Sequence, residues 1–123
     1  AGALDRACDH VIRCMEGARD AGADAIILYI HWGDEFSVAT TNSQRAIAQK
    51  LCELGVDVIA GSHPHVVQPV ELLTSTTDEN QKTVCLYSMG NAVSNQRLGN
   101  ISYVKTAQRS CSKNCHNAKK NTD

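Results

Sequence analysis

The chain has 123 residues, with 12 basic and 13 acidic side chains, a formal net charge of −1 and 4% aromatic residues. The balanced charge and scarce aromatics argue against nucleic acid or an anionic membrane as a partner, because those surfaces are recognised by basic patches and stacking rings. No apolar run approaches the ~18 residues of a membrane-spanning helix, and no basic-then-apolar signal sequence is found. With 42% hydrophobic residues, we predict a globular domain with no membrane segment in this chain.

Residues 4–21 are predicted to form an amphipathic helix. Its apolar side chains recur at three- and four-residue spacing, and Gly22 is a suitable residue to end it. His10 lies off this stripe and is expected at the solvent-facing surface. The stripe consists of Leu4, Cys8, Val11, Ile12, Met15 and Ala18.

Two short apolar runs, 25–30 and 56–60, are typical of strands buried on both faces of a parallel sheet. Between them, Thr41 and Gln44 match the S/T-x-x-E/Q capping box, which predicts the start of a second helix. Gly55 is expected to end that helix. The order strand, helix, strand predicts a right-handed parallel βαβ unit.

The remaining sequence pattern predicts a hairpin followed by a tail. Pro69 restricts residues 66–73 to an edge or irregular strand, and residues 83–88 are expected to pair with it across a polar turn. From residue 106 onward the sequence is polar and without periodicity, so we predict that residues 106–123 are disordered.

The six cysteines fall into two groups. Cys8, Cys14, Cys52 and Cys85 lie in apolar segments, which favours reduced, buried thiols over a disulfide framework. In the tail, Cys111, Cys115 and His116 offer only three zinc ligands with poor spacing. An incidental exposed tail is the favoured interpretation there.

Three histidines follow the two predicted strands. His31 ends the first run, and His63 and His65 follow the second on either side of Pro64. Ligands of open α/β sheets bind at the carboxyl ends of the strands, and neighbouring strands lie only ~5 Å apart. Because imidazole is the commonest metal ligand, a shared metal site is one interpretation. A pair of solvated loop histidines is the other, and the spacing alone leaves both open.

Several polar residues lie near these histidines in the sequence. Asp34, Glu35 and Asn91 are candidates to orient an imidazole ring through a hydrogen bond, although Asn91 also suits a turn. An acidic helix start or a solvated loop is the alternative interpretation of both carboxylates, and it is favoured more for Glu35 than for Asp34. Trp32 is expected to pack beneath the loop, and no catalytic residue is assigned.

Three segments of the sequence closely resemble motifs of the CapA family of capsule and poly-γ-glutamate synthesis proteins, and they occur in the same order as in that family. That family resembles a branch of the calcineurin-like metallophosphoesterases, and the likeness extends over residues 23–104. The segments are His31-Trp32-Gly33-Asp34-Glu35, then Gly61-Ser62-His63-Pro64-His65-Val66-Val67-Gln68-Pro69-Val70-Glu71, then Leu86-Tyr87-Ser88-Met89-Gly90-Asn91.

The resemblance implies an α/β fold, as part of a metallophosphoesterase-like α/β/β/α sandwich. Residues 1–105 would be the C-terminal part of that domain, followed by the tail at 106–123. It implies His31, His63 and His65 as metal ligands and a divalent cofactor, one or two ions of manganese, iron or zinc. Such a centre activates water, so the implied reaction is hydrolysis of a phosphoester or of a polyglutamate amide.

The family's N-terminal Asp-x-His and Asn-His motifs are not found before His31. We therefore expect that the chain is a fragment and that its metal site could be empty. We also expect one face of its sheet to be uncovered, which would cause poor solubility or association. The alternatives are a non-catalytic module that binds an anionic polymer such as poly-γ-glutamate, or a metal, within an assembly of capsule-synthesis proteins, and an inert remnant. The family resemblance implies the bacterial cell surface as the location.

Overall fold

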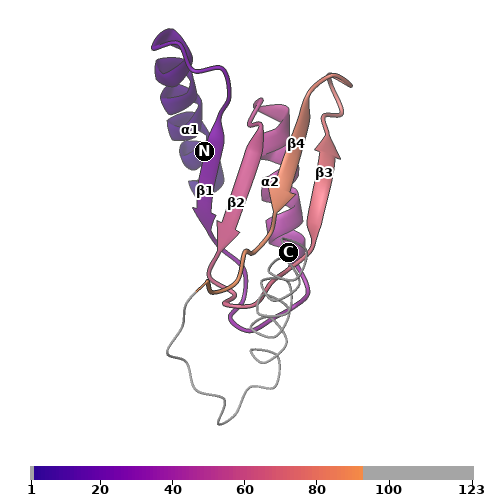
Figure 1. Cartoon of the computed structure of the whole chain (residues 1–123). Coiled ribbons are helices and arrows are strands. Elements are labelled where there is room, and N and C mark those ends of the chain that lie inside the picture. The colour runs from indigo at the N-terminus through magenta and orange to yellow at the C-terminus, as the bar shows by residue number, and fades with distance from the viewer. Residues whose placement is uncertain (1, 93–123) are drawn as a thin grey trace, which may run out of the picture.

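The computed structural model of the chain describes residues 2–92 as one four-stranded sheet with two helices (Figure 1). The strand order is β1-β2-β4-β3, in which β1, β2 and β4 are parallel and β3 is antiparallel to β4. The elements are α1 (Ala3–Asp20), β1 (Ile27–His31), α2 (Asn42–Glu53), β2 (Val58–Ser62), β3 (Val70–Thr74) and β4 (Lys82–Leu86).

The predicted α/β class is confirmed, as is the order of a parallel βαβ unit followed by a hairpin. β3 lies at the edge of the sheet, where the preceding Pro69 does not interrupt a central ladder. The pairing of β4 with β2, which places Val58 beside Val84, joins the hairpin to the βαβ unit. No sequence pattern predicted that pairing.

The helix ends follow from local chemistry. Gly22 has a φ of 94°, and the Ala23 N–H donates to the Ala18 carbonyl at 3.0 Å, as expected for a helix ended by glycine. At the start of α2, the Thr41 hydroxyl accepts from the Gln44 N–H at 3.1 Å, and the Gln44 side chain accepts from the Thr41 N–H at 2.9 Å. The predicted capping box is therefore confirmed.

The hydrophobic core lies between the two helices and one face of the sheet. Met15 of α1 and Leu51 of α2 meet Ile59 of β2 there, and Ile59 has no exposed surface. The predicted stripe on α1 supplies this contact. Within residues 2–92, no helix is long and apolar enough to cross a membrane.

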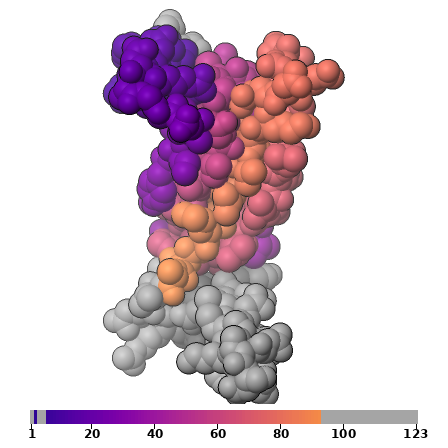
Figure 2. All heavy atoms as spheres, turned by 45° about the horizontal axis from the view of Figure 1, so that its top comes forward, coloured from indigo at the N-terminus to yellow at the C-terminus, as the bar shows by residue number. Residues whose placement is uncertain are grey.

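Within residues 2–92, no helix or strand covers the opposite face of the sheet (Figures 1 and 2). Ile27 is 70% exposed and Tyr29 66% exposed, so the prediction that the first strand is buried on both faces was wrong. Alternate strand residues point to opposite faces, and the helices cover only one of them. The register aligns two rows of side chains across this uncovered face, namely Ile27, Val58, Val84 and Leu72, and Tyr29, Ala60, Leu86 and Val70.

This arrangement supplies one helix layer and one sheet layer, two of the four layers of the predicted sandwich. Three of the predicted buried thiols, Cys8, Cys52 and Cys85, are free and buried. Cys14 is free but exposed, which corrects the prediction, because it lies off the apolar stripe of α1. The tail at 106–123 lies outside the described residues.

Candidate metal centre

Parallel pairing of β1 with β2 places His31 beside Ser62, so His63 follows at the same edge of the sheet. The centroids of the His31 and His63 rings lie 4.4 Å apart. The His65 ring lies 6.2 Å from that of His63. The fold therefore gathers three histidines from two strand ends at the carboxyl edge of the parallel strands, where α/β sheets bind ligands.

The turn around Pro64 holds both flanking histidines in left-handed backbone conformations. His63 has a φ of 100° and His65 a φ of 60°. Non-glycine residues avoid this region, at a cost of about 1–3 kcal/mol each, and strain of this kind gathers at functional sites. Pro64 itself is buried and anchors the turn.

The loop after β1 is fastened to this turn by two backbone hydrogen bonds. The Trp32 N–H donates to the Ser62 carbonyl at 3.1 Å, and the Phe36 N–H donates to the Pro64 carbonyl at 2.8 Å. The Phe36 ring stacks on His65 with centroids 5.7 Å apart. As a result, the residue before Phe36 is held against the histidine pair.

That residue is Glu35. Its Oε1 lies 3.9 Å from Nε2 of His65, and one ligand atom from each of Glu35, His63 and His65 lies within 4.8 Å of the others. Tetrahedral coordination at about 2.1 Å needs ligand atoms about 3.4 Å apart, so small side-chain rotations would close the set. Two imidazoles and a carboxylate suit zinc, iron or manganese.

Asn91, which follows β4, reaches the same histidine from the other side. Its Oδ1 lies 3.0 Å from Nδ1 of His65. With the amide oxygen as acceptor, Nδ1 carries the proton, and Nε2 is left with a free lone pair on the side of Glu35. Asn91 is therefore placed to orient His65.

The other predicted site residues are placed differently. His31 is exposed and its Nδ1 lies 3.4 Å from the Ser62 hydroxyl. Its ligand atoms do not belong to the group formed by Glu35, His63 and His65. Asp34 is also exposed and outside that group. Sequence reasoning favoured Asp34 over Glu35 as the carboxylate near a histidine, since nothing in the sequence shows which of the two side chains the turn brings close to His65.

Beneath the site, buried polar contacts join the segments that carry it. The Trp32 indole N–H donates to the Tyr87 carbonyl at 2.8 Å, so the tryptophan packs under the loop as predicted. Burial is the main cause that raises the pKa of Tyr87 well above its usual range. Its neutral hydroxyl donates to Glu71 at 3.1 Å.

A buried glutamine pair, which the sequence did not reveal, fixes the two loops to each other. The Gln44 side chain donates to Gln68 at 2.9 Å. The Gln68 amide in turn donates to the carbonyls of Ser37 at 2.9 Å and Ala39 at 3.1 Å. Removing one amide would leave its partners unsatisfied, so the pair holds the loop after β1 on the histidine turn.

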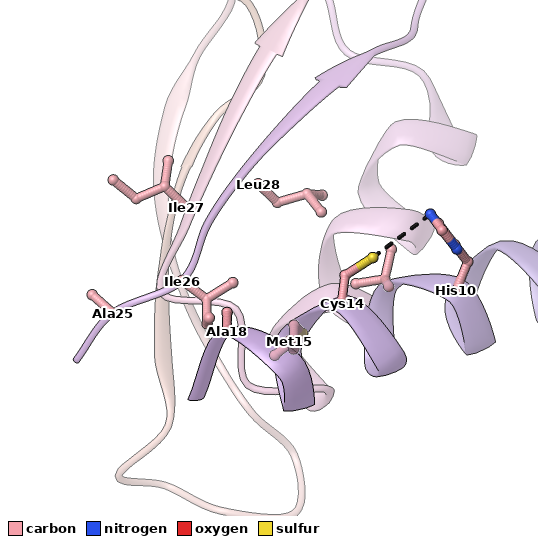
Figure 3. A pocket seen from close by; sticks show the side chains of 9 residues that line it. His10, Cys14, Met15, Ala18, Ala25, Ile26, Ile27 and Leu28 are labelled. Carbon is pink, nitrogen blue, oxygen red and sulfur yellow. Dashed lines mark hydrogen bonds between the residues drawn. The ribbon is translucent and has the colours of Figure 1, made fainter. Parts of the chain in front are cut away.

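A separate hollow of about 400 Å³ lies away from the histidine turn, between α1 and the start of β1 (Figure 3). In Figure 3, Leu28 points toward α1, while Ile27 points to the other side of the strand. His10 and Cys14 lie at its rim, with His10 Nε2 3.6 Å from the Cys14 sulfur. The lining is otherwise apolar, so this hollow is a gap in packing beside the core.

The sequence profile of the family described as "Bacterial capsule synthesis protein PGA_cap" matches residues 4–96. The chain belongs to this family. The matched range contains His31, His63, His65, Glu35 and Asn91. Together with two relatives that are named CapA, the match confirms the resemblance to the CapA family.

Two curated relatives of this PGA_cap chain come from Bacillus. The "PGA biosynthesis protein CapA" of Bacillus subtilis (strain 168) is 36% identical over 74 residues, which covers 60% of this chain and 18% of the relative. The "Capsule biosynthesis protein CapA" of Bacillus anthracis is 31% identical over 98 residues, covering 77% of this chain and 22% of the relative. The chain thus spans about a fifth of the length of these relatives. No solved structure matches the chain significantly.

Proposed function

We propose that this chain supplies the histidine side of a metal centre in a CapA-type protein of capsule or poly-γ-glutamate biosynthesis. The reaction we propose is hydrolysis of a phosphoester or of a polyglutamate amide. The observation that carries the proposal is the convergence of His31, His63 and His65 at the carboxyl edge of two parallel strands. Membership of the PGA_cap family and the names of the two relatives support the biosynthetic setting.

In this proposal His31, His63 and His65 bind divalent manganese, iron or zinc. When bound, such a metal lowers the pKa of water and neutralises charge on the reacting oxygens. The chain's own residues orient the ligands. The left-handed turn around Pro64 aims the two imidazoles, and Asn91 keeps the proton on Nδ1 of His65. The proposed partners are poly-γ-glutamate and other capsule-synthesis proteins.

The test uses the purified 123-residue chain loaded with Mn²⁺, Fe²⁺ or Zn²⁺. It measures release of an aryl alcohol from a phosphodiester and shortening of poly-γ-glutamate by size-exclusion chromatography. We expect metal-dependent hydrolysis of one of these substrates. Activity should be lost when His63 and His65 are both changed to alanine, because the metal then loses two ligands.

The matched control is His10→Ala, which removes an exposed histidine from α1 and should leave hydrolysis unchanged. Loss of activity in both variants would contradict a role for the histidine turn. Co-elution of intact poly-γ-glutamate with the chain, without hydrolysis, would instead support the non-catalytic binding module.

A further inference from the structure

We propose that Glu35 is a metal ligand, and that with His63 and His65 it forms a complete one-ion site within this chain. The site would bind a borderline divalent cation such as Zn²⁺, Co²⁺ or Fe²⁺ through two imidazoles and one carboxylate. Because it concerns the same place in the fold, the inference rests on the proposed metal function. It adds a carboxylate that the three-histidine set lacks.

The geometry singles out Glu35 among the nearby carboxylates. Its oxygen, and one nitrogen each of His63 and His65, lie within 4.8 Å of one another. Asp34 is its immediate neighbour in sequence yet stands outside this group. His31 adjoins His63 through ring contact, but its nitrogens do not reach the group.

The backbone explains why Glu35 takes this place. Gly33 turns the chain with a φ of 79°, and Phe36 adopts a φ of 61°. The Phe36 N–H then donates to the Pro64 carbonyl, between the two histidines, at 2.8 Å. Glu35 is thus held between a turn and an anchored residue, so its side chain needs only rotamer changes to reach an ion. This preorganisation lowers the entropy cost of coordination.

Charge favours the same set. Three neutral imidazoles would leave a divalent ion with its full charge, whereas the Glu35 carboxylate cancels half of it. The His65 ring is already oriented, since Asn91 lies 3.0 Å from its Nδ1 and leaves Nε2 facing Glu35 at 3.9 Å. A carboxylate on one side and a hydrogen-bond acceptor behind the imidazole are the arrangement seen around metal-bound histidines.

The experiment titrates the full chain with Co²⁺ and follows its visible ligand-field absorption, with Zn²⁺ competition giving the affinity. We expect binding at one equivalent in the parent. Glu35→Gln should weaken it by about 100-fold or more, since loss of an outer hydrogen-bond partner alone costs 10–100-fold. The matched control Asp34→Asn removes the same charge one residue away and should change the affinity less than about threefold.

His31→Ala and the double variant His63→Ala with His65→Ala separate this inference from the proposed function. Retention of Co²⁺ in His31→Ala with loss in Glu35→Gln supports the one-ion site. Loss in both variants supports a set of four ligands that includes Glu35. Circular dichroism of each variant establishes that the fold is kept.

The inference is overturned if the parent binds no Co²⁺, or if Glu35→Gln binds it as the parent does. In the latter case, loss of Co²⁺ in the double histidine variant would leave the proposed metal centre standing. Conversely, if Glu35→Gln abolishes binding while the loaded parent hydrolyses neither substrate, the ligand role holds and the proposed hydrolysis fails.

Discussion

At Gly61, β2 lies close to two neighbouring segments of the chain. A Cβ added there would lie 2.1 Å from the Tyr87 carbonyl oxygen and 2.7 Å from the indole nitrogen of Trp32. The first of these atoms belongs to the backbone and has no rotamer to move. The glycine therefore permits the close approach of three segments directly beneath His63.

We predict that Gly61→Ala destabilises the chain by about 1–3 kcal/mol, because overpacked backbone must shift. Chemical denaturation measures the free energy of unfolding. The control is Gly17→Ala on α1, where an added Cβ meets nothing within 4 Å and stability should rise by about 0.5–1 kcal/mol. Equal stabilities of the two variants would contradict the predicted crowding at Gly61.

The cysteines provide a second prediction at the scale of single residues. Cys14 is exposed, whereas Cys8, Cys52 and Cys85 are buried. Burial is the main cause that raises the pKa of Cys85 to about 12, so this thiol carries almost no reactive thiolate at neutral pH. In a chain with Cys111→Ser and Cys115→Ser, we expect Cys14 alone to react rapidly with a thiol reagent, as counted by mass spectrometry. Rapid labelling of Cys52 or Cys85 in the folded chain would show that the core opens readily.

Among the elements, the end of α2 and the β3–β4 turn are joined through one carboxylate. Glu53 accepts hydrogen bonds from the Thr76 N–H at 2.8 Å and the Thr77 hydroxyl at 3.1 Å, and from the Ser75 hydroxyl. The bond from Ser75, followed by that from the Thr76 N–H, holds the pKa of Glu53 well below its ordinary value of 4.5. The contact fixes the turn of the hairpin to the helix layer.

This depressed pKa predicts a pH-dependent stability difference between the parent and Glu53→Gln. A carboxyl whose folded pKa is lowered stabilises the fold above its ordinary pKa and loses that contribution as the pH falls toward the folded value. The parent should therefore be more stable than Glu53→Gln at neutral pH, and the difference should narrow below pH 4.5. Urea unfolding from neutral pH to about pH 3 measures it, and a gap that widens in acid would contradict the assignment.

Considered as a whole, the molecule has a core on one side of its sheet and apolar strand residues on the other. Ile27 and Leu72 are 70% and 63% exposed and lie in one row across all four strands. Face-to-face packing of two sheets is the usual way to bury such rows. In a solution of the purified chain, a second copy presents the same apolar face as a partner.

We predict that the purified chain self-associates through this face in a concentration-dependent manner. The double variant Ile27→Thr with Leu72→Thr introduces threonine, which is common in strands, but removes apolar surface area. It should therefore shift the chain toward monomer. Sedimentation velocity measures the distribution. A control with Arg13→Gln and Glu16→Gln on the exposed side of α1 should not change it. A parent that stays monomeric at all concentrations would contradict the prediction.

Several features of this fold could be predicted from the sequence because they depend on interactions between residues close together in the chain. The capping box of Thr41 and Gln44, the helix end at Gly22 and the edge position required by Pro69 all depend on residues near one another in the chain. The position of His31 and His63 at neighbouring strand ends followed from the βαβ pattern, because parallel strands share their carboxyl edge.

Tertiary structure decided the contacts between segments some thirty residues apart. Which of Asp34 and Glu35 faces the histidines depends on the bond from Phe36 to Pro64. The approach of Asn91 to His65 depends on β4 pairing with β2. The sequence also did not show which sheet face the helices cover, because a continuous apolar strand looks alike on both faces. Packing of the whole domain decides which face the helices cover, and the periodicity within one strand does not indicate it.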